Sequence, residues 1–191
     1  TVLATGSVGA TGTFSINVGA YTGAIIAKLV DSNSGVDFTD EATGQARDMT
    51  ANLMAIGVAS TGTVTLNINA LTTVAAMKAG AVFAGASTAT ITADVVTLSN
   101  TAVASAFGLA DLIGTVVVTT IDATGAANAN YTPDALSAGE KYGAILASLS
   151  GADLINGGNM QTTVDSLANG LTVTGSTGTL STAALNTVIL G

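Results

Sequence analysis

Hydrophobic and polar residues alternate in two stretches of similar sequence, residues 11–28 and 61–78. Both stretches begin with Thr-Gly-Thr and end with Lys, and they are identical at seven of eighteen positions. Thr22 and Thr72 precede runs of Ala, Ile, Val and Met, and threonine is a common helix N-cap. Every second residue before them is apolar, which is typical of a β-strand: Phe14, Ile16 and Val18 in the first stretch, Val64, Leu66 and Ile68 in the second. We therefore expect a strand followed by a short helix in both.

The hydrophobic pattern also predicts helices and strands over residues 40–56 and 88–121. An amphipathic helix is predicted over residues 40–56, ended by Gly57, because apolar residues recur there at helical spacing: Ala42, Ala46, Met49, Leu53 and Ile56. Further along, we expect a strand within residues 88–98, an Ala-rich helix over 102–113 and a buried β-branched strand over 116–121.

The last third of the chain contains the clearest local signals. Ser137 and Glu140 have the spacing of a capping box and predict a helix that continues to about residue 149. A second cap at residues 162–165 predicts a short helix. We expect a strand at residues 171–174, one helical turn at 182–186 and an apolar terminal strand at 188–190.

These elements predict an α+β or α/β fold that is β-rich, is built from repeated strand-helix units and has exposed edge strands. We expect one compact assembly of an extended N-terminal segment (1–10), a first unit (11–60), a second unit (61–114) and C-terminal units (115–191). The N-terminal segment alternates as a strand does. It could pair within its own subunit or add to a neighbour's sheet, and both interpretations stay open.

Charged residues make up only 8% of the chain, and the net charge is −8. The basic residues are Lys28, Arg47, Lys78 and Lys141, too few and too scattered to neutralise phosphates, which excludes nucleic-acid binding. A surface of Thr, Ser, Asn and Gly can pack against another subunit without desolvating many charges. The alternative is that this composition is a general bias of secreted proteins rich in Ala and Thr and has no relation to subunit packing.

Cysteine and histidine are absent, which excludes the common nucleophile-base pairs and most transition-metal sites. No glycine motif for binding phosphates is present. We therefore expect no enzymatic activity. The chain begins at Thr1 rather than Met, so we expect a processed exported protein or an excised fragment, located outside the cell. No apolar run is long and uninterrupted enough to predict a membrane span.

The densest group of acidic residues lies at positions 31–41. Its oxygen ligands are of the kind that calcium prefers: Asp31, Asn33, Asp37, Asp40 and Glu41. The sequence therefore predicts a candidate calcium site and no other cofactor. The alternative is a solvated turn followed by a helix whose positive N-terminal end favours Asp40 and Glu41.

The Thr-Gly-Thr strand starts, the helix at 136–149 and the closing segment LTVTGSTGTLSTAALNTVILG resemble Thr/Ala/Gly-rich, cysteine-free bacterial surface proteins. These are S-layer proteins and the repeat regions of RTX-type secreted adhesins. The tandem Gly-Gly-x-Gly-x-Asp calcium repeat of RTX proteins is missing, and only Gly157-Gly158 is similar to it. A looser similarity, at residues 13–30, is to flagellar and phage-tail proteins.

The resemblance and the absence of reactive groups lead to one expectation of function. We expect a non-enzymatic extracellular structural protein, a homo-oligomer or polymer whose copies form a surface layer or a pilus-like filament, with strand addition as one route. The alternatives are an adhesin or ligand-binding module of a larger secreted protein, and a phage or virion structural protein.

Overall fold

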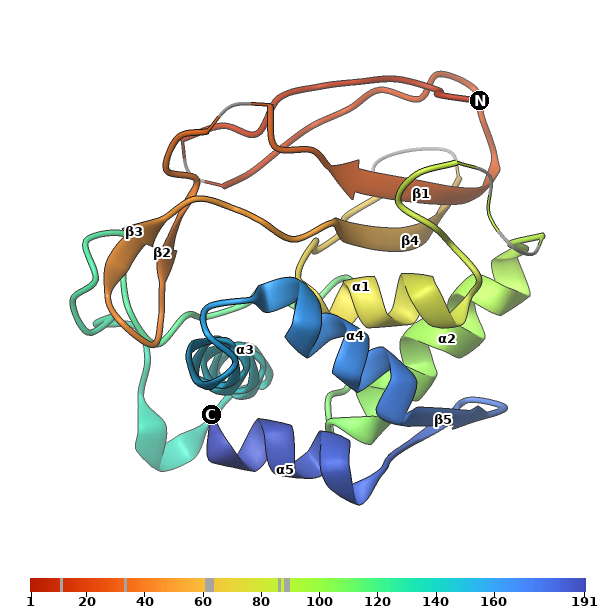
Figure 1. Cartoon of the computed structure of the whole chain (residues 1–191). Helices are drawn as coiled ribbons and strands as arrows, with labels where there is room; N and C mark the ends of the chain where they lie inside the picture. Colours follow the sequence, from red (N-terminus) through yellow and green to blue (C-terminus); the bar gives the residue numbers. More distant parts are fainter. Residues whose placement is uncertain (11, 33, 61–63, 86, 88–89) are drawn as a thin grey trace.

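The computed structural model of this chain is a mixed α+β fold, and it describes all residues except 11, 33, 61–63, 86, 88 and 89. The described residues form five α-helices, one short 3-10 helix and three antiparallel sheets of two strands each (Figure 1). In chain order these elements are β1 (Gly23–Leu29), β2 (Phe38–Asp40), β3 (Gln45–Arg47), β4 (Leu53–Ala59), α1 (Ala70–Lys78), α2 (Ala93–Ala106), η1 (Pro133–Ala135), α3 (Ala138–Ile155), α4 (Met160–Gly170), β5 (Leu171–Thr174), β6 (Thr177–Leu180) and α5 (Thr182–Leu190).

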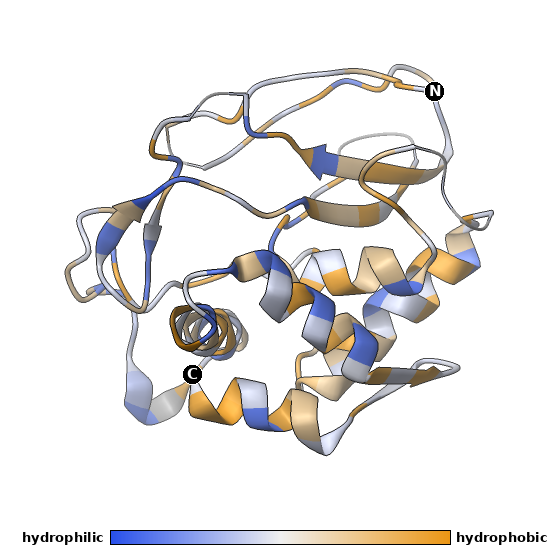
Figure 2. Ribbon diagram, in the orientation of Figure 1, coloured by the Kyte–Doolittle hydropathy of each residue, from blue (hydrophilic) through white to orange (hydrophobic). Residues whose placement is uncertain are grey.

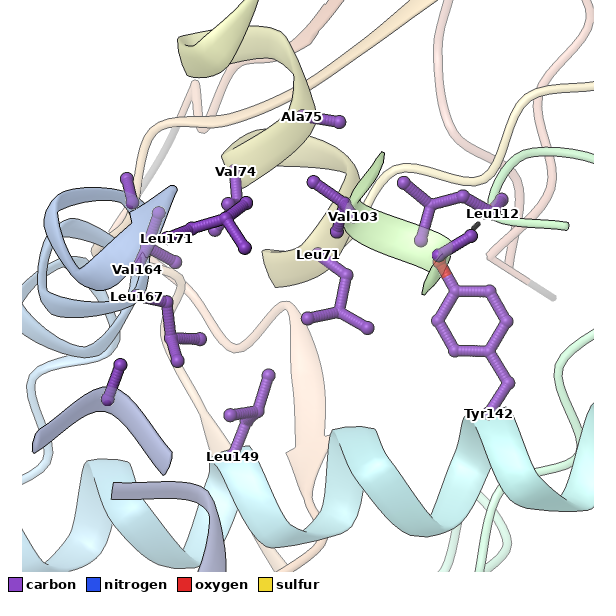
Figure 3. Close-up of a cluster of buried hydrophobic side chains, with 13 residues drawn as sticks. Leu71, Val74, Ala75, Val103, Leu112, Tyr142, Leu149, Val164, Leu167 and Leu171 are labelled. Atoms are coloured by element: carbon purple, nitrogen blue, oxygen red, sulfur yellow. Dashed lines mark hydrogen bonds between the residues drawn. The ribbon is translucent and has the colours of Figure 1, made fainter. Parts of the chain in front are cut away.

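The main hydrophobic core lies among the five helices and β5. Leu71 and Val74 of α1 occupy its centre, and Figure 3 shows them between α2, α3 and α4. The other large buried side chains of this core are Val103, Leu112, Tyr142, Leu149, Val164, Leu167 and Leu171. Because all five helices bury apolar side chains here, burial of apolar surface is the main source of stability.

A second core joins the β1–β4 sheet to α1 and α2. Met54 and Ile56 of β4 pack on Ala76 of α1 and Val96 of α2, and Ile26 of β1 contacts this cluster. The sheet therefore lies on one side of the two helices, as Figure 1 shows. Residues Leu53 to Gly57 are all buried, which explains why β4 reads as a continuous apolar run rather than as alternation.

Polar contacts fix the start of α1 against α3. Asn69 is the N-cap of α1, and its side chain accepts hydrogen bonds from the N–H groups of Leu71 and Thr72. Its Nδ2 donates to the hydroxyl of Tyr142 at 3.0 Å, and that hydroxyl donates to the carbonyl of Leu112 at 2.9 Å. Tyr142 is fully buried, so these bonds satisfy a hydroxyl that would otherwise be costly inside the core.

The two similar stretches do not have the same structure, so the predicted repeated units are not observed. The second stretch contains the predicted helix, α1, whereas the equivalent residues of the first form β1. The difference begins at the helix cap, because the position equivalent to Asn69 is Gly19, which has no side chain and a φ of +65°. The strands predicted at 14–18 and 64–68 carry no regular structure, and parts of both stretches lie outside the described residues.

The predicted helix over residues 40–56 is wrong. This stretch contains the end of β2, all of β3 and the first part of β4. The side chain of Asp40 accepts hydrogen bonds from the N–H groups of Ala42 and Thr43, and Gly44 has a φ of +65°. These features make a tight hairpin turn where a helix would need continuous αR geometry.

Three strand predictions also fail between residues 90 and 190, and one predicted helix has other bounds, while residues 88 and 89 lie outside the described residues. Residues 93–98 belong to α2, which Thr92 caps and which ends at Ala106 instead of reaching 113. The terminal apolar residues 188–190 are the last turn of α5 rather than a strand. Residues 116–121 have no partner strand apart from an isolated bridge between Ile121 and Ala127, and Val116 is 79% exposed.

The capping-box prediction is confirmed, whereas the predicted threonine caps are wrong: Thr72 is the third residue of α1, which Asn69 caps, and Thr22 precedes β1. Ser137 and Glu140 form the capping box at the start of α3, although this helix continues to Ile155. Strand β5 has the predicted bounds, and α5 begins where the helical turn was expected. Helix α4 contains residues 162–165, but its N-cap is Asn159 rather than Thr162, and it begins at Met160. Helices contain more residues than strands in the described chain, so the fold is not β-rich.

Within the described residues, no helix has both the length and the apolar character needed to cross a bilayer.

Candidate functional site

Three aspartates form the one acidic group in the described residues whose geometry suits a metal ion. Single carboxylate oxygens of Asp31, Asp37 and Asp48 all lie within 4.8 Å of one another. Asp37 and Asp48 flank the β2–β3 hairpin, and Asp31 follows β1. The N–H of Asp37 donates to the carbonyl of Arg47 at 2.8 Å, and the N–H of Met49 donates to Asp37 Oδ2 at 2.9 Å. The base of the hairpin therefore holds the two aspartates side by side.

The three carboxylates repel one another when all are ionised. Partial desolvation raises the pKa of Asp48 above its usual range, and the negative charges of Asp31 and Asp37 raise the pKa further. All three side chains are exposed, so a cation could reach their oxygens from solvent. Hard carboxylate oxygens in this arrangement match the ligand preference of calcium.

The sequence-predicted calcium ligands are only partly brought together. Asp31 and Asp37 lie in the cluster, whereas Asn33 lies outside the described residues. Asp48 was not among the predicted ligands, because residues 40–56 were predicted to form a helix, which would not return Asp48 to Asp37. A hairpin interpretation with Gly44 in the turn would have placed Asp37 and Asp48 on neighbouring strand ends.

The other two predicted ligands, Asp40 and Glu41, connect the hairpin to the rest of the fold instead. Asp40 Oδ1 accepts from Ser150 Oγ of α3 at 3.0 Å, and Asp40 Oδ2 lies 3.7 Å from Arg47 Nε. Glu41 Oε1 accepts from the N–H and the hydroxyl of Thr120, at 2.9 and 3.0 Å. The alternative in which these acids sit at a helix N-terminus is also wrong, because they belong to the hairpin turn.

Asp153 is a buried carboxylic acid that sequence reasoning did not identify. It is 8% exposed on α3, and its Oδ1 has no hydrogen-bond partner among the described residues. Burial raises its pKa to about 6, a hydrogen bond with Thr163 of α4 opposes this shift, and the charge of Asp40 adds to it. Since an ionised carboxylate is costly to bury with one oxygen unpartnered, we expect the stability of the junction of α3 and α4 to depend on pH.

Two hollows are present on the described surface. One, of about 260 Å³, lies between β4 and α2, where Val58, Val96 and Asn100 line it. The other, of about 520 Å³, lies beside the second half of α3 and is lined by Tyr131, Ser148 and Ile155 among others. The lining of the second combines a glutamate, hydroxyl groups and apolar side chains, a mixture that can contact a peptide or another protein surface.

Large apolar side chains are exposed at two places in particular. The first is the N-terminal segment, where Val2 is 78% exposed. The second, here named the α3–α5 patch, consists of Leu154, Ile155, Ile189 and Leu190 at the ends of the two helices, each between 49% and 71% exposed. Figure 2 shows the apolar end of α5 beside the C-terminus. The helices meet closely here, since a side chain at Gly151 would overlap the carbonyl of Gly191.

The comparisons with known proteins give this site no relative from which a role could be carried over. No protein-family model, curated protein or solved structure matches this chain.

Proposed function

We propose that this chain is a non-enzymatic, extracellular structural protein whose copies assemble into a surface layer or a filament. The observation that carries the proposal is the exposed apolar surface. Fourteen large hydrophobic side chains of the described residues are exposed, in a chain with only sixteen charged residues. Contiguous exposed apolar patches mark interaction surfaces, and few charged side chains have to be desolvated when two such surfaces meet.

The α3–α5 patch supports contact between protein surfaces in particular. Its four aliphatic side chains lie at the ends of two packed helices, and two of them, Leu154 and Ile155, also line the larger hollow. Covering them would remove apolar area from water at a cost of few desolvated charges, because Glu41 is the one charged residue that lines the hollow. Non-enzymatic function is part of the proposal because the sequence has neither histidine nor cysteine to serve as a nucleophile or general base.

Negative-stain microscopy of the purified chain tests the proposal. We expect ordered sheets or filaments as protein concentration rises, because burial of the apolar patches on contact is favourable. The variant Ile189→Ser removes an exposed aliphatic side chain from the patch and should reduce the assemblies. Thr187→Ser, on the same helix, is the matched control and should leave them unchanged. Strictly monomeric particles across concentration, pH and calcium would contradict the proposal.

Calcium binding at Asp31, Asp37 and Asp48 is a second, separate proposal. A divalent cation would neutralise three carboxylates that now repel one another, and it would bind the folded hairpin in preference to the unfolded chain. Added calcium should therefore raise the Tm of the metal-free protein, and a chelator should reverse the rise. Differential scanning calorimetry measures both changes.

The variant Asp48→Asn should abolish the response to calcium, because it removes one ligand and leaves the hairpin hydrogen bonds of Asp37 in place. Asp134→Asn changes an exposed aspartate in η1, outside the cluster, and should respond as the original chain does. An unchanged Tm on addition of calcium to the original chain would remove the proposal.

A ligand-binding module of a larger secreted protein is the alternative that the larger hollow favours. It predicts a chain that stays monomeric and binds a ligand beside Tyr131 and Ile155. The microscopy described above separates the two, since only the structural role requires ordered assemblies.

A further inference from the structure

The two outer edges of the β1–β4 sheet differ in whether their backbone groups have hydrogen-bond partners. On the β4 side, the N–H of Met54 donates to Thr73 Oγ1 at 2.9 Å, and its carbonyl accepts from Thr72 Oγ1 at 3.0 Å. The carbonyl of Ile56 accepts from Asn100 Nδ2 at 3.1 Å. Side chains of α1 and α2 thus satisfy the backbone groups of this edge, which prevents another strand from pairing there.

The register of the sheet shows which backbone groups β1 presents on the opposite edge. Lys28 faces Met54 and Ile26 faces Ile56, and both β4 residues direct their backbone groups away from β1. In an antiparallel pair, facing residues either exchange both hydrogen bonds or direct both sets outward. Ala24, Ile26 and Lys28 therefore direct their N–H and carbonyl groups to the outer edge of β1.

This edge is unpaired in the described part of the chain. Of the outward backbone groups, only the carbonyl of Ala24 has a hydrogen-bond partner there, the hydroxyl of Tyr21 at 2.9 Å. The usual protections of an edge strand are missing, because β1 contains no proline and only one charge. That charge, on Lys28, is engaged elsewhere: its Nζ donates to the carbonyl of Phe83 at 2.6 Å.

The N-terminal segment supplies an unpaired strand of matching character. Residues 1–8 have no regular secondary structure and run as an extended chain on the same side of the molecule as β1 (Figure 1). None of their backbone groups has a hydrogen bond to another described residue. Val2 and Leu3 are 78% and 47% exposed, and residues 1–27 contain no charged side chain. An alternating, uncharged segment of this kind is suited to strand addition.

We propose that residues 1–8 of one copy pair as a strand with the outer edge of β1 in a second copy. The inference rests on the proposed assembly and identifies its contact. In its own copy the segment is held against residues 13–16, since Gly9 bonds to Thr13 and a side chain at Gly6 would touch Ile16. The contact joins different surfaces of the two copies, so its repetition from copy to copy produces a filament, or a ring where the rotation between copies closes.

A truncated chain that lacks residues 1–8, together with a fluorescent peptide of those residues, tests the inference. The truncated chain should keep its circular dichroism spectrum and Tm, because the segment makes no hydrogen bonds to the fold, but it should fail to assemble. The peptide should bind it saturably, as measured by fluorescence anisotropy. The same peptide with Leu3→Pro, which removes one backbone donor, is the matched control and should bind about tenfold more weakly.

The variant Ala24→Pro, placed in the truncated chain, tests the acceptor edge. It removes an outward N–H and no bond to β4, so the fold should persist while peptide affinity falls by about tenfold or more. Assembly of the truncated chain at the original level would overturn the inference and leave the proposed function standing. If the truncated chain binds the peptide while the full-length chain stays monomeric and does not bind it, the segment pairs within one copy, which would overturn both proposals. Full-length Val2→Lys gives the same readout if truncation impairs folding.

Discussion

Gly143→Ala is expected to destabilise the folded chain by about 1–3 kcal/mol, the usual cost of overpacking. Gly143 is buried on α3, and a side chain there would overlap the backbone carbonyl of Val118. The extended segment at 116–119 would have to move away from the helix, although its Val118 N–H bonds to the carbonyl of Gly139 at 3.1 Å. The β-branched residues at 116–119 therefore pack against α3 instead of pairing with another strand.

Urea unfolding followed by circular dichroism measures how Gly143→Ala changes the free energy of unfolding. Whether this free energy falls or rises decides the test. At a helical position with free space, replacing glycine by alanine raises the free energy of unfolding by about 1 kcal/mol. At Gly143 we expect the same replacement to lower it. Ala144→Gly, one residue along the same helix, is the matched control and should lose about 1 kcal/mol from helix propensity alone. An unchanged or increased free energy of unfolding for Gly143→Ala would contradict the packing of α3 against residues 116–119.

Asp153→Asn is expected to stabilise the chain at neutral pH by about 1–3 kcal/mol. Ionised Asp153 is buried with one oxygen unpartnered, and the charge of Asp40 opposes its ionisation. Asparagine has a similar shape and carries no charge, so the cost of burying the carboxylate disappears. The amide should still bond to Thr163, which keeps the junction of α3 and α4 intact.

The pH dependence gives the same prediction a second readout. The pKa of Asp153 is about 6 in the folded chain and 3.8 ordinarily, so between these values the folded state binds more protons. Stability should therefore be higher at pH 4.5 than at neutral pH and fall as pH rises through about 6. Most of this slope should be absent in Asp153→Asn and unchanged in the exposed control Asp134→Asn. A flat profile between those pH values in the original chain would contradict the assignment.

The ionisation of Glu140 also makes stability depend on pH, but in a more acidic range than that of Asp153. Hydrogen bonds from Ser137 and Thr132 lower its pKa to about 2 from an ordinary 4.5. Its stabilising contribution is complete above pH 4.5 and is lost as pH falls toward 2. The stability gained from Asp153 on mild acidification therefore lies at higher pH than the loss from Glu140.

The parts of the fold that the sequence could predict depend on neighbours along the chain. The capping box of Ser137 and Glu140 needs only four residues, and it identified the start of α3 correctly. The apolar run at residues 53–56 fits a helix or a buried strand equally well. Its structure is decided by pairing with β1, some thirty residues away, which no local pattern contains.

The candidate metal site was predicted only in part for the same reason. Asp31 and Asp37 lie in one acidic stretch and were recognised, whereas Asp48 joins them because the hairpin folds back. One difference between the two similar stretches lies at the helix cap, because Asn69 caps α1 and the equivalent Gly19 has no side chain to do so. The seven identical residues of stretches 11–28 and 61–78 therefore could not show that the first stretch contains a strand where the second contains a helix.

The central claim is that copies of this chain bind one another, and sedimentation velocity over a wide range of protein concentration tests it most directly. We predict that the sedimentation coefficient increases with concentration, and that species much larger than the 18.4 kDa chain accumulate. A single species of monomer mass at every concentration would contradict the claim.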